Sequence, residues 1–451
     1  MNLARTFESV GILILLLLLM APGAVAKSGS NVLPNIIVIL TDDMGYGDIG
    51  AYGNTQIDTP HIDAIAQRGV LLTNGYASAN VCTPSRAGLL TGRYAIRSGL
   101  AWKVVEVGDS RSLPASEETI AELVKGAGYQ AGMVGKWHLG SFPGSSPMLH
   151  GFDYFFGVPH SNDMPDFALY EGEEIIEQRV DQRSLTRRYT EAATSFIADS
   201  ADAPFLLYLA HTFPHIPLYA SAAFAGKSRA GVYGDVVQEI DWSTGEIVAE
   251  LRRNNLLENT LIIFTSDNGP FFEGSTAGLK GGKGNSWEGG YRVPFIVSWP
   301  AVITAGRSLD TLAINIDILP TIAEAVDRSP GAEIIDGQSL LPALVGRSNV
   351  ENRYFYYFNN EAVVGLRDEA WKFMTHAYYT TSIGAFEKFN KLPGFESSYD
   401  LLFDARALNG ESYSVAEREP ETVVRFKREL LNARKEFDLL RTRPAEKTYP
   451  N

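Results

Sequence analysis

Apolar runs alternate with helical patterns through the first three hundred residues of this chain. Asn35 to Leu40 form an apolar run, which is typical of a parallel strand buried on both faces. Runs of the same kind at 130–134, 204–210 and 261–265 predict further strands. Because each run is short and turn residues separate it from the next pattern, we expect one sheet built from several strands.

Helical patterns fill the intervals between these strands. A helix is predicted over 59–69, since a threonine cap is followed by Pro60 at the first helical position. Another is predicted over 117–128, which ends on a glycine, and crossover helices are predicted over 187–197 and 234–254. This alternation predicts an α/β fold with a mostly parallel central sheet and helices on both faces.

The pattern changes past Gly331. Aromatic and β-branched runs at 354–358, 362–366 and 370–374 predict a smaller antiparallel sheet. Residues 419–441 predict a charged, amphipathic terminal helix. We therefore divide the chain into an N-terminal domain (33–330) and a C-terminal α+β subdomain (331–451).

The first 26 residues have the pattern of a secretory signal peptide. Arg5 precedes an apolar stretch from Gly11 to Ala21, and Ala24-Val25-Ala26 supplies the small residues of a cleavage site. The stretch is shorter than the ~20 residues that span a bilayer comfortably. We expect an exported protein, periplasmic or secreted, with no stable membrane span after cleavage; a retained anchor is the alternative.

Composition narrows the class further. The chain is 45% hydrophobic and 20% charged, as in ordinary soluble globular proteins. Its net charge of −14 excludes binding to nucleic acid or anionic membranes through bulk charge. A single cysteine, Cys82, cannot form an internal disulfide, so stability must come from a large core.

Polar side chains follow three of the predicted strands. Asp42 and Asp43 follow the first, Lys136-Trp137-His138 a later one, and Asp267-Asn268 another. The carboxyl ends of parallel strands meet at one edge of a sheet, so these groups are expected to share one site. Three carboxylates and one amide oxygen suit Ca²⁺, with Mg²⁺ as an alternative. Taken singly, the two acidic clusters are also compatible with turns, and the third cluster with a surface lysine and a packed histidine.

Cys82 opens the run Cys-Thr-Pro-Ser-Arg, followed by Thr-Gly-Arg at 91–93. Pro84 suits the first turn of a helix, so Cys82 is expected at a helix entrance, where free N–H groups favour an anion. Arg86 lies four residues on and returns to the same face. We expect this group in a surface cleft. A small buried hydrophobe or a redox-sensing thiol are the alternatives for the cysteine.

This run resembles the maturation signature of the type I, formylglycine-dependent sulfatases of the alkaline phosphatase superfamily. Three more blocks are similar to that family: Gly-Lys-Trp-His-Leu-Gly at 135–140, a segment ending in His215-Ile216-Pro217, and Gly-Lys-Gly at 282–284 with Glu-Gly-Gly at 288–290. The likeness runs from Pro34 to Ile318 and weakly through 397–401, and is greatest to the arylsulfatase A and N-acetylgalactosamine-6-sulfatase branch. Residues 101–111 match nothing in it.

The resemblance implies that 33–330 is a catalytic sulfatase domain. It implies conversion of Cys82 to formylglycine (3-oxoalanine) by a maturation enzyme, with the hydrated aldehyde as nucleophile. It implies catalytic roles for Cys82, Arg86, Lys136, His138, His215 and Lys283, a calcium site at Asp42, Asp43, Cys82, Asp267 and Asn268, and a supporting role for Ser161. His211 and Lys280 are expected to be structural and surface residues.

The function implied is hydrolysis of a sulfate ester, an aryl sulfate or a sulfated carbohydrate, to an alcohol and inorganic sulfate. A phosphomonoester or phosphonate hydrolase on the same superfold is one alternative, since the fold alone does not decide the substrate. A glycan-binding protein without turnover is the other, if Cys82 is not matured.

Overall fold

The computed structural model describes residues 33–347, 353–375, 400–407 and 410–443. The predicted signal peptide lies outside these ranges, as do residues 397–399 of the weak C-terminal match. The described residues from Leu33 onward form one compact unit, so the boundary at residue 330 stays a prediction.

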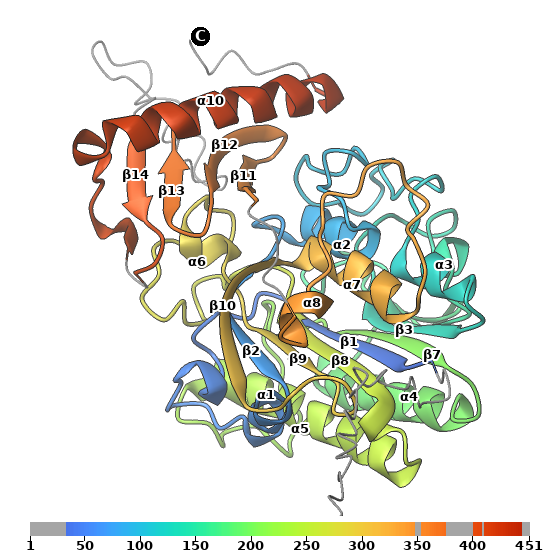
Figure 1. Cartoon of the computed structure of the whole chain (residues 1–451). Helices are drawn as coiled ribbons and strands as arrows, with labels where there is room; N and C mark the ends of the chain where they lie inside the picture. The colour runs from blue at the N-terminus through green and yellow to red at the C-terminus, as the bar shows by residue number, and fades with distance from the viewer. Residues whose placement is uncertain (1–32, 348–352, 376–399, 408–409, 444–451) are drawn as a thin grey trace, which may run out of the picture. The chain divides into compact units, whose positions relative to one another are not determined.

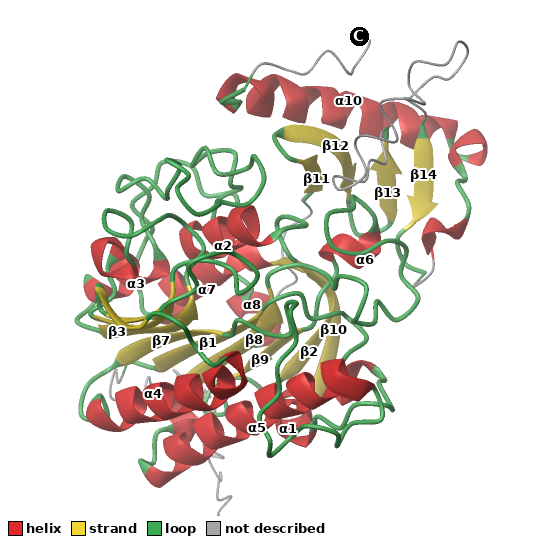
Figure 2. Ribbon diagram, turned by 180° about the vertical axis from the view of Figure 1, so that it is seen from behind, coloured by secondary structure: helices red, strands yellow, loops and turns green. Residues whose placement is uncertain are grey.

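A ten-stranded sheet forms the centre of this unit (Figures 1 and 2). Its strands, in spatial order, are β10 (Arg307–Ile314), β2 (Val70–Tyr76), β9 (Phe295–Ser298), β8 (Thr260–Ser266), β1 (Asn35–Thr41), β7 (Phe205–Ala210), β3 (Gln130–Lys136), β4 (Tyr154–Val158), β5 (Leu169–Glu171) and β6 (Glu174–Glu177). The ladders β8–β1–β7–β3–β4 and β10–β2 are parallel, whereas β9 and the β5–β6 hairpin pair antiparallel. The predicted mostly parallel sheet is confirmed.

Strand β1 shows why its sequence is apolar throughout. All seven of its residues are buried, and alternate side chains enter two separate hydrophobic cores. Ile36, Val38 and Leu40 belong to one core, and Ile37 and Ile39 to the other. This is the period-2 geometry of a strand covered on both faces.

Helices cover both faces of the sheet (Figure 2). One face carries α1 (Pro60–Arg68), α4 (Leu185–Asp199) and α5 (Gly231–Arg253); the other carries α2 (Cys82–Thr91), α3 (Ile120–Lys125), α7 (Ile318–Ala325) and α8 (Leu341–Leu344). The helix predicted over 117–128 is shorter, because Thr119 caps α3 in a reciprocal capping box with Glu122.

The smaller sheet is also confirmed. Strands β11 (Phe355–Asn359), β12 (Ala362–Arg367), β13 (Trp371–Met374) and β14 (Leu401–Asp404) pair antiparallel in that order. Helix α10 (Pro420–Phe437) lies along this sheet (Figure 1). Its buried residues, which include Phe426 and Leu430, belong to the same hydrophobic core as the strands. The α-helix ends at Phe437, four residues before the predicted end at residue 441.

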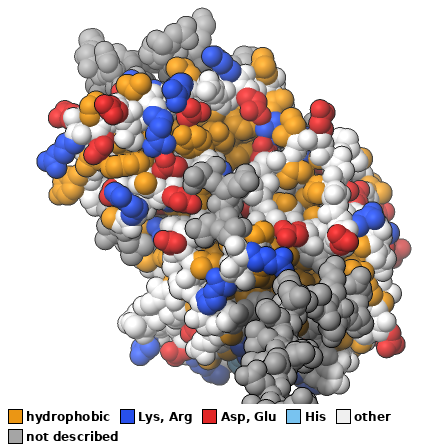
Figure 3. All heavy atoms as spheres, in the orientation of Figure 1, with side chains coloured by type: hydrophobic (Ala, Val, Ile, Leu, Met, Phe, Trp, Pro, Cys, Tyr) orange, Lys and Arg blue, Asp and Glu red, His pale blue; other side chains and the backbone are white. Residues whose placement is uncertain are grey.

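The visible surface carries charged side chains of both signs. On the face shown in Figure 3, Lys and Arg side chains are interspersed with Asp and Glu over the described residues. None of the described helices is long and apolar enough to cross a membrane.

Candidate active site

The polar clusters meet at the carboxyl edge of the sheet. Asp42 and Asp43 directly follow β1, Lys136 is the last residue of β3, and Asp267 directly follows β8. The ladder continues one step further, since the Asp267 N–H donates to the Thr41 carbonyl at 3.1 Å. The three carboxylates are buried. The sheet topology thus brings together residues that lie up to 225 positions apart.

Cys82 is the first residue of α2, as the sequence predicts. Its Sγ donates to Asp42 Oδ1 at 3.4 Å. The side chain is only 1% exposed, so the expectation of an open surface cleft is wrong: every residue of α2 is buried under the site. Burial, then the Asp42 carboxylate, raises the pKa of the Cys82 thiol well above its usual value. These are poor conditions for a redox-sensing thiol, which needs exposure and a depressed pKa.

Arg86 ties the cluster together from the same helix face. Its Nε donates to Asp267 Oδ2 at 2.9 Å, its Nη1 donates to the Lys136 carbonyl at 2.8 Å, and its Nη2 lies 3.5 Å from Asp42 Oδ1. Burial alone would raise the pKa of Asp42, but Lys136 and Arg86 hold it well below its usual value. For Asp267, burial and the negative charge of Asp42 outweigh the effect of Arg86, and its pKa rises to about 7.

Lys136 is fully buried, which excludes the reading of a surface lysine. Its Nζ lies 2.5 Å from Asp42 Oδ2 and donates to Ser161 Oγ at 3.2 Å. Ser161 lies three residues after β4; the resemblance implied that it supports the active-site histidine, and in this structure its hydroxyl contacts Lys136.

Asp43 is the second centre of contacts. Lys283 Nζ lies 2.8 Å and His215 Nε2 3.7 Å from its Oδ2, while Asn268 Nδ2 donates to its Oδ1 at 2.7 Å. Burial would lower the pKa of Lys283, but the Asp43 carboxylate raises it above its usual value. Burial lowers the pKa of His215, with Asp43 opposing. Lys283 is therefore held in its charged form, whereas burial favours the neutral form of His215.

The donor set fits a hard divalent cation. One possible ligand atom from each of Asp42, Asp43, Cys82 and His215 lies within 4.8 Å of the other three. Asn268 Oδ1 is buried and has no hydrogen-bond partner among the described residues, which leaves an amide oxygen available as a ligand. In this structure both Asp267 oxygens accept hydrogen bonds, Oδ1 from the Asp43 N–H and Oδ2 from Arg86 Nε.

His138 sits in a constrained position. It has a φ of 60°, in the left-handed region, and its Nε2 lies 3.1 Å from the Val105 carbonyl. A carbonyl only accepts, so Nε2 carries the hydrogen and Nδ1 keeps the lone pair. Nδ1 is buried and without a partner among the described residues. Burial, then Lys136 and Arg86, lowers the pKa of His138 well below its usual value.

Thr83 fixes that histidine. Its hydroxyl donates to the His138 carbonyl at 2.9 Å and accepts from the Val105 N–H at 3.0 Å. Val105 belongs to residues 101–111, the segment without a match in the resemblance. No side-chain pattern indicates this contact, because Val105 contributes only backbone atoms.

His211 and Lys280, which the sequence analysis expects to be structural and surface residues, make none of the side-chain contacts described above. His211 is fully buried, neither ring nitrogen has a partner among the described residues, and burial lowers its pKa to about 3. Lys280 is exposed, with Nζ 3.7 Å from the centre of the Trp287 ring. Both agree with structural or surface roles.

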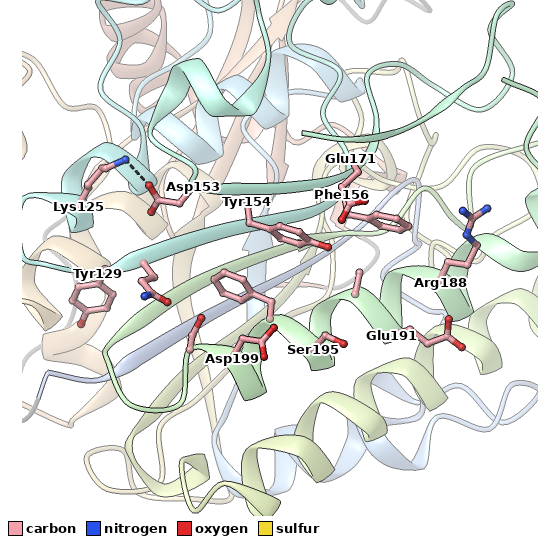
Figure 4. Close-up of a pocket in the computed structure, with 14 residues that line it drawn as sticks. Lys125, Tyr129, Asp153, Tyr154, Phe156, Glu171, Arg188, Glu191, Ser195 and Asp199 are labelled. Atoms are coloured by element: carbon pink, nitrogen blue, oxygen red, sulfur yellow. Dashed lines mark hydrogen bonds and ion pairs between the residues drawn. The ribbon is translucent and has the colours of Figure 1, made fainter. Parts of the chain in front are cut away.

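A pocket of about 890 Å³ lies at the opposite end of the strands (Figure 4). Gln130 and Tyr154, the first residues of β3 and β4, line it together with Arg188 and Phe196 of α4. None of the candidate site residues lines this pocket, so it does not hold the chemistry of the cluster.

Comparison with known proteins decides the family. The sequence model of the sulfatase family matches residues 34–327, which include every candidate site residue. The chain belongs to the sulfatase family. A second model, the C-terminal region of N-sulphoglucosamine sulphohydrolase, matches residues 283–393 of this sulfatase.

Individual relatives agree. The sulfatase is 37% identical to steryl-sulfatase of Homo sapiens, over 76% of this chain and 75% of that protein. It is 35% identical to N-acetylgalactosamine-6-sulfatase of Canis lupus familiaris, over 83% of this chain and 77% of that protein. A solved Bacteroides thetaiotaomicron structure, described under the metabolism of multiple glycosaminoglycans, matches with a TM-score of 0.79 and 27% identity, covering 90% of this chain and 100% of that one.

This sulfatase is therefore a sulfuric ester hydrolase. The relatives do not favour the alternatives of a phosphomonoester hydrolase or a non-catalytic glycan-binding protein. The formylglycine mechanism is general to the family.

Proposed function

We propose that this sulfatase is exported and hydrolyses a sulfated saccharide or an aryl sulfate, after a maturation enzyme has converted Cys82 to formylglycine. The observation that carries the proposal is the convergence of Arg86, Lys136 and Lys283 on the carboxylates beside Cys82. Export rests on the signal-peptide pattern of residues 1–26. Saccharide substrates are favoured because one relative is named for a sulfated sugar and one structural neighbour for glycosaminoglycan metabolism.

Two groups would complete the site. The hydrated aldehyde at position 82 would supply a nucleophile with two hydroxyls on one carbon, which serine cannot offer. A calcium ion, with magnesium as an alternative, would be held by Asp42, Asp43, Asn268, Asp267 and residue 82, and would offset negative charge on the sulfate oxygens.

The chain's own cations bind the sulfate group. Lys136 and Lys283 are fixed by ion pairs of 2.5 and 2.8 Å, so no reorganisation is needed when an anionic oxygen arrives. His215 lies on the same side as Lys283, against the same Asp43 oxygen. Arg86 is too deeply engaged with Asp267 to reach the ester, and its role is to hold the charge around residue 82.

Three groups move protons. Asp267 accepts the proton of the attacking hydroxyl, because burial and the Asp42 charge raise its pKa. His215 protonates the leaving alcohol, because the raised pKa of Lys283 keeps that lysine charged for binding the sulfate group. His138 takes the proton of the second hydroxyl through the free Nδ1 when sulfate is released.

A substrate panel with a peptide analysis tests the proposal. The mature protein should cleave an activated aryl sulfate and at least one class of sulfated saccharide, and should be much slower on matched phosphate esters. The peptide with residue 82 should lack the thiol mass and react with an aldehyde probe, whereas Cys82→Ser should show neither activity nor probe reaction. Full activity of a preparation whose Cys82 is unmodified would refute the proposed nucleophile.

A further inference from the structure

Glu288 is a buried carboxylate that the proposed mechanism does not use. It opens the short helix α6 (Glu288–Tyr291), five residues after Lys283. The hydroxyls of Tyr76 and Tyr357 each donate to it at 2.5 Å, and Lys372 Nζ lies 3.1 Å away. Arg367 and Arg292 lie 3.6 and 3.9 Å from it. Burial would raise the pKa of Glu288, but Lys372 and the two arginines hold it well below its usual value.

Most of these partners come from the smaller sheet. Tyr357, Arg367 and Lys372 belong to β11, β12 and β13. Lys372 also lies 2.6 Å from Glu411, whose other oxygen accepts the Glu288 N–H at 2.9 Å. The Lys372 ammonium further donates to the Ser286 carbonyl at 3.2 Å. Lys372 is 1% exposed. Through this buried lysine, the smaller sheet contacts both the Ser286 carbonyl and the Glu288 carboxylate of the turn at 286–288.

That turn packs directly on the loop that carries Lys283. The Gly289 N–H donates to the Lys280 carbonyl at 2.8 Å, and the Asn285 N–H to the Gly282 carbonyl at 3.0 Å. A Cβ on Gly290 would lie 2.4 Å from the Asn285 carbonyl oxygen, so backbone meets backbone with no space between.

The same turn reaches the other side of the site. The Gly269 N–H, directly after Asn268, donates to the Gly290 carbonyl at 3.0 Å, and the Lys283 N–H donates to the Pro270 carbonyl at 2.8 Å. A shift of Glu288 is therefore transmitted to the substrate-facing lysine and to the predicted metal ligand together.

A buried ion network of this kind is a weak source of stability, because desolvation offsets most of its Coulomb energy. Its directional contacts do fix geometry. We propose that Lys372 is a positioning residue of the active site: acting through Glu288, it holds the 282–290 loop so that Lys283 lies in place for the sulfate group. The proposal rests on the proposed role of Lys283 in sulfate binding.

The test uses the mature full chain, an activated aryl sulfate, and inorganic sulfate as a competitive inhibitor. Lys372→Met removes the ammonium while keeping a long apolar side chain. It should weaken sulfate inhibition and lower kcat/KM by about tenfold, which corresponds to about 1.4 kcal/mol. Lys427→Met is the matched control, since Lys427 pairs with Asp400 in the same part of the chain but is 50% exposed; it should change neither.

A double-mutant cycle separates positioning from general destabilisation. In a Lys283→Ala background, Lys372→Met should cause no further loss, because the group it positions is gone. If Lys372→Met lowers the unfolding temperature but leaves kcat/KM and sulfate inhibition unchanged, or if the two losses multiply, the inference is wrong. If Lys283→Ala alone leaves sulfate inhibition unchanged, the proposed role of Lys283 has failed, and the inference with it.

A second variant covers the case that Lys372→Met does not fold. Glu411→Gln keeps the shape of the side chain and an acceptor for the Glu288 N–H, but removes the charge that faces Lys372. It should give the same pattern in smaller degree, again without further loss in the Lys283→Ala background. A folded Glu411→Gln variant with unchanged kinetics would contradict the proposal.

Discussion

Replacing Thr83 by valine tests how the site positions His138, the proposed proton acceptor during sulfate release. Valine has the shape of threonine without the hydroxyl, so His138 O and Val105 N–H both lose their partner. Both residues are buried, and each unsatisfied backbone group costs about 1–3 kcal/mol. The expected loss in free energy of unfolding is therefore about 2–6 kcal/mol.

The catalytic effect follows from the same bonds. His138 has a positive φ, which is uncommon for residues other than glycine, and its ring is oriented by the Val105 carbonyl. Without the hydroxyl both constraints loosen, and a misplacement of about 1 Å costs about 10²-fold in rate. Since His138 is assigned to sulfate release, the first turnover should be fast and later ones slow.

Urea unfolding and rapid-mixing kinetics on an activated aryl sulfate measure the two effects. Thr83→Val should release a burst of alcohol and then stall, as His138→Ala should. Thr83→Ser keeps the hydroxyl and should retain both stability and steady turnover. A Thr83→Val variant whose stability and turnover equal those of Thr83→Ser would refute the argument that the hydroxyl positions His138.

Three further predictions concern other groups. Asp43→Asn should lose bound calcium and turnover together, measured by metal analysis, whereas retention of either alone would separate the two roles. His215→Ala should slow cleavage most for alcohols of high pKa and little for an activated aryl sulfate, because poor leaving groups need the proton; an equal loss on both would count against it. Burial raises the pKa of Asp241 to about 7, above an unfolded value of about 3.9, so its contribution to stability falls as pH rises through that range. The wild type should lose about 3 kcal/mol of stability in urea between pH 5 and pH 8 through this group, whereas Asp241→Asn should not show that loss.

The sequence predicted the strands that are buried on both faces. Strands β1, β3, β7 and β8 each contain a short run without charged residues, and all or nearly all of their residues are buried. This pattern can be read without knowing which strands pair with them. Strand β9 escaped prediction because it has only four residues and its antiparallel pairing depends on distant partners. The β5–β6 hairpin lies at the sheet edge, where exposure weakens the pattern.

Some contacts of the candidate site could be predicted from the sequence and others could not. Asp42, Lys136 and Asp267 could be placed from the sequence, because a parallel sheet gathers the residues that follow its strands. The contact of Glu288 with Lys372 could not, since it joins α6 to strand β13 of the smaller sheet, 84 positions further along the chain. Nor could the burial of Cys82, which follows from the packing of α2 among α7 and neighbouring segments and not from any property of residues 82–86.

The balance of formal charge explains why such a site needs a cation to bind an anion. Asp42, Asp43 and Asp267 face three cations, Arg86, Lys136 and Lys283, so the chain alone supplies no net positive charge there when all six are ionised. The chain as a whole carries −14, so long-range attraction to a sulfate ester is absent. A divalent ion at the Asp42–Asp43 cluster would make the site positive while leaving both lysines in place. Removal of that ion should then weaken the binding of inorganic sulfate itself and not only turnover, and equal sulfate affinity with and without a chelator would show that the lysines bind the anion unaided.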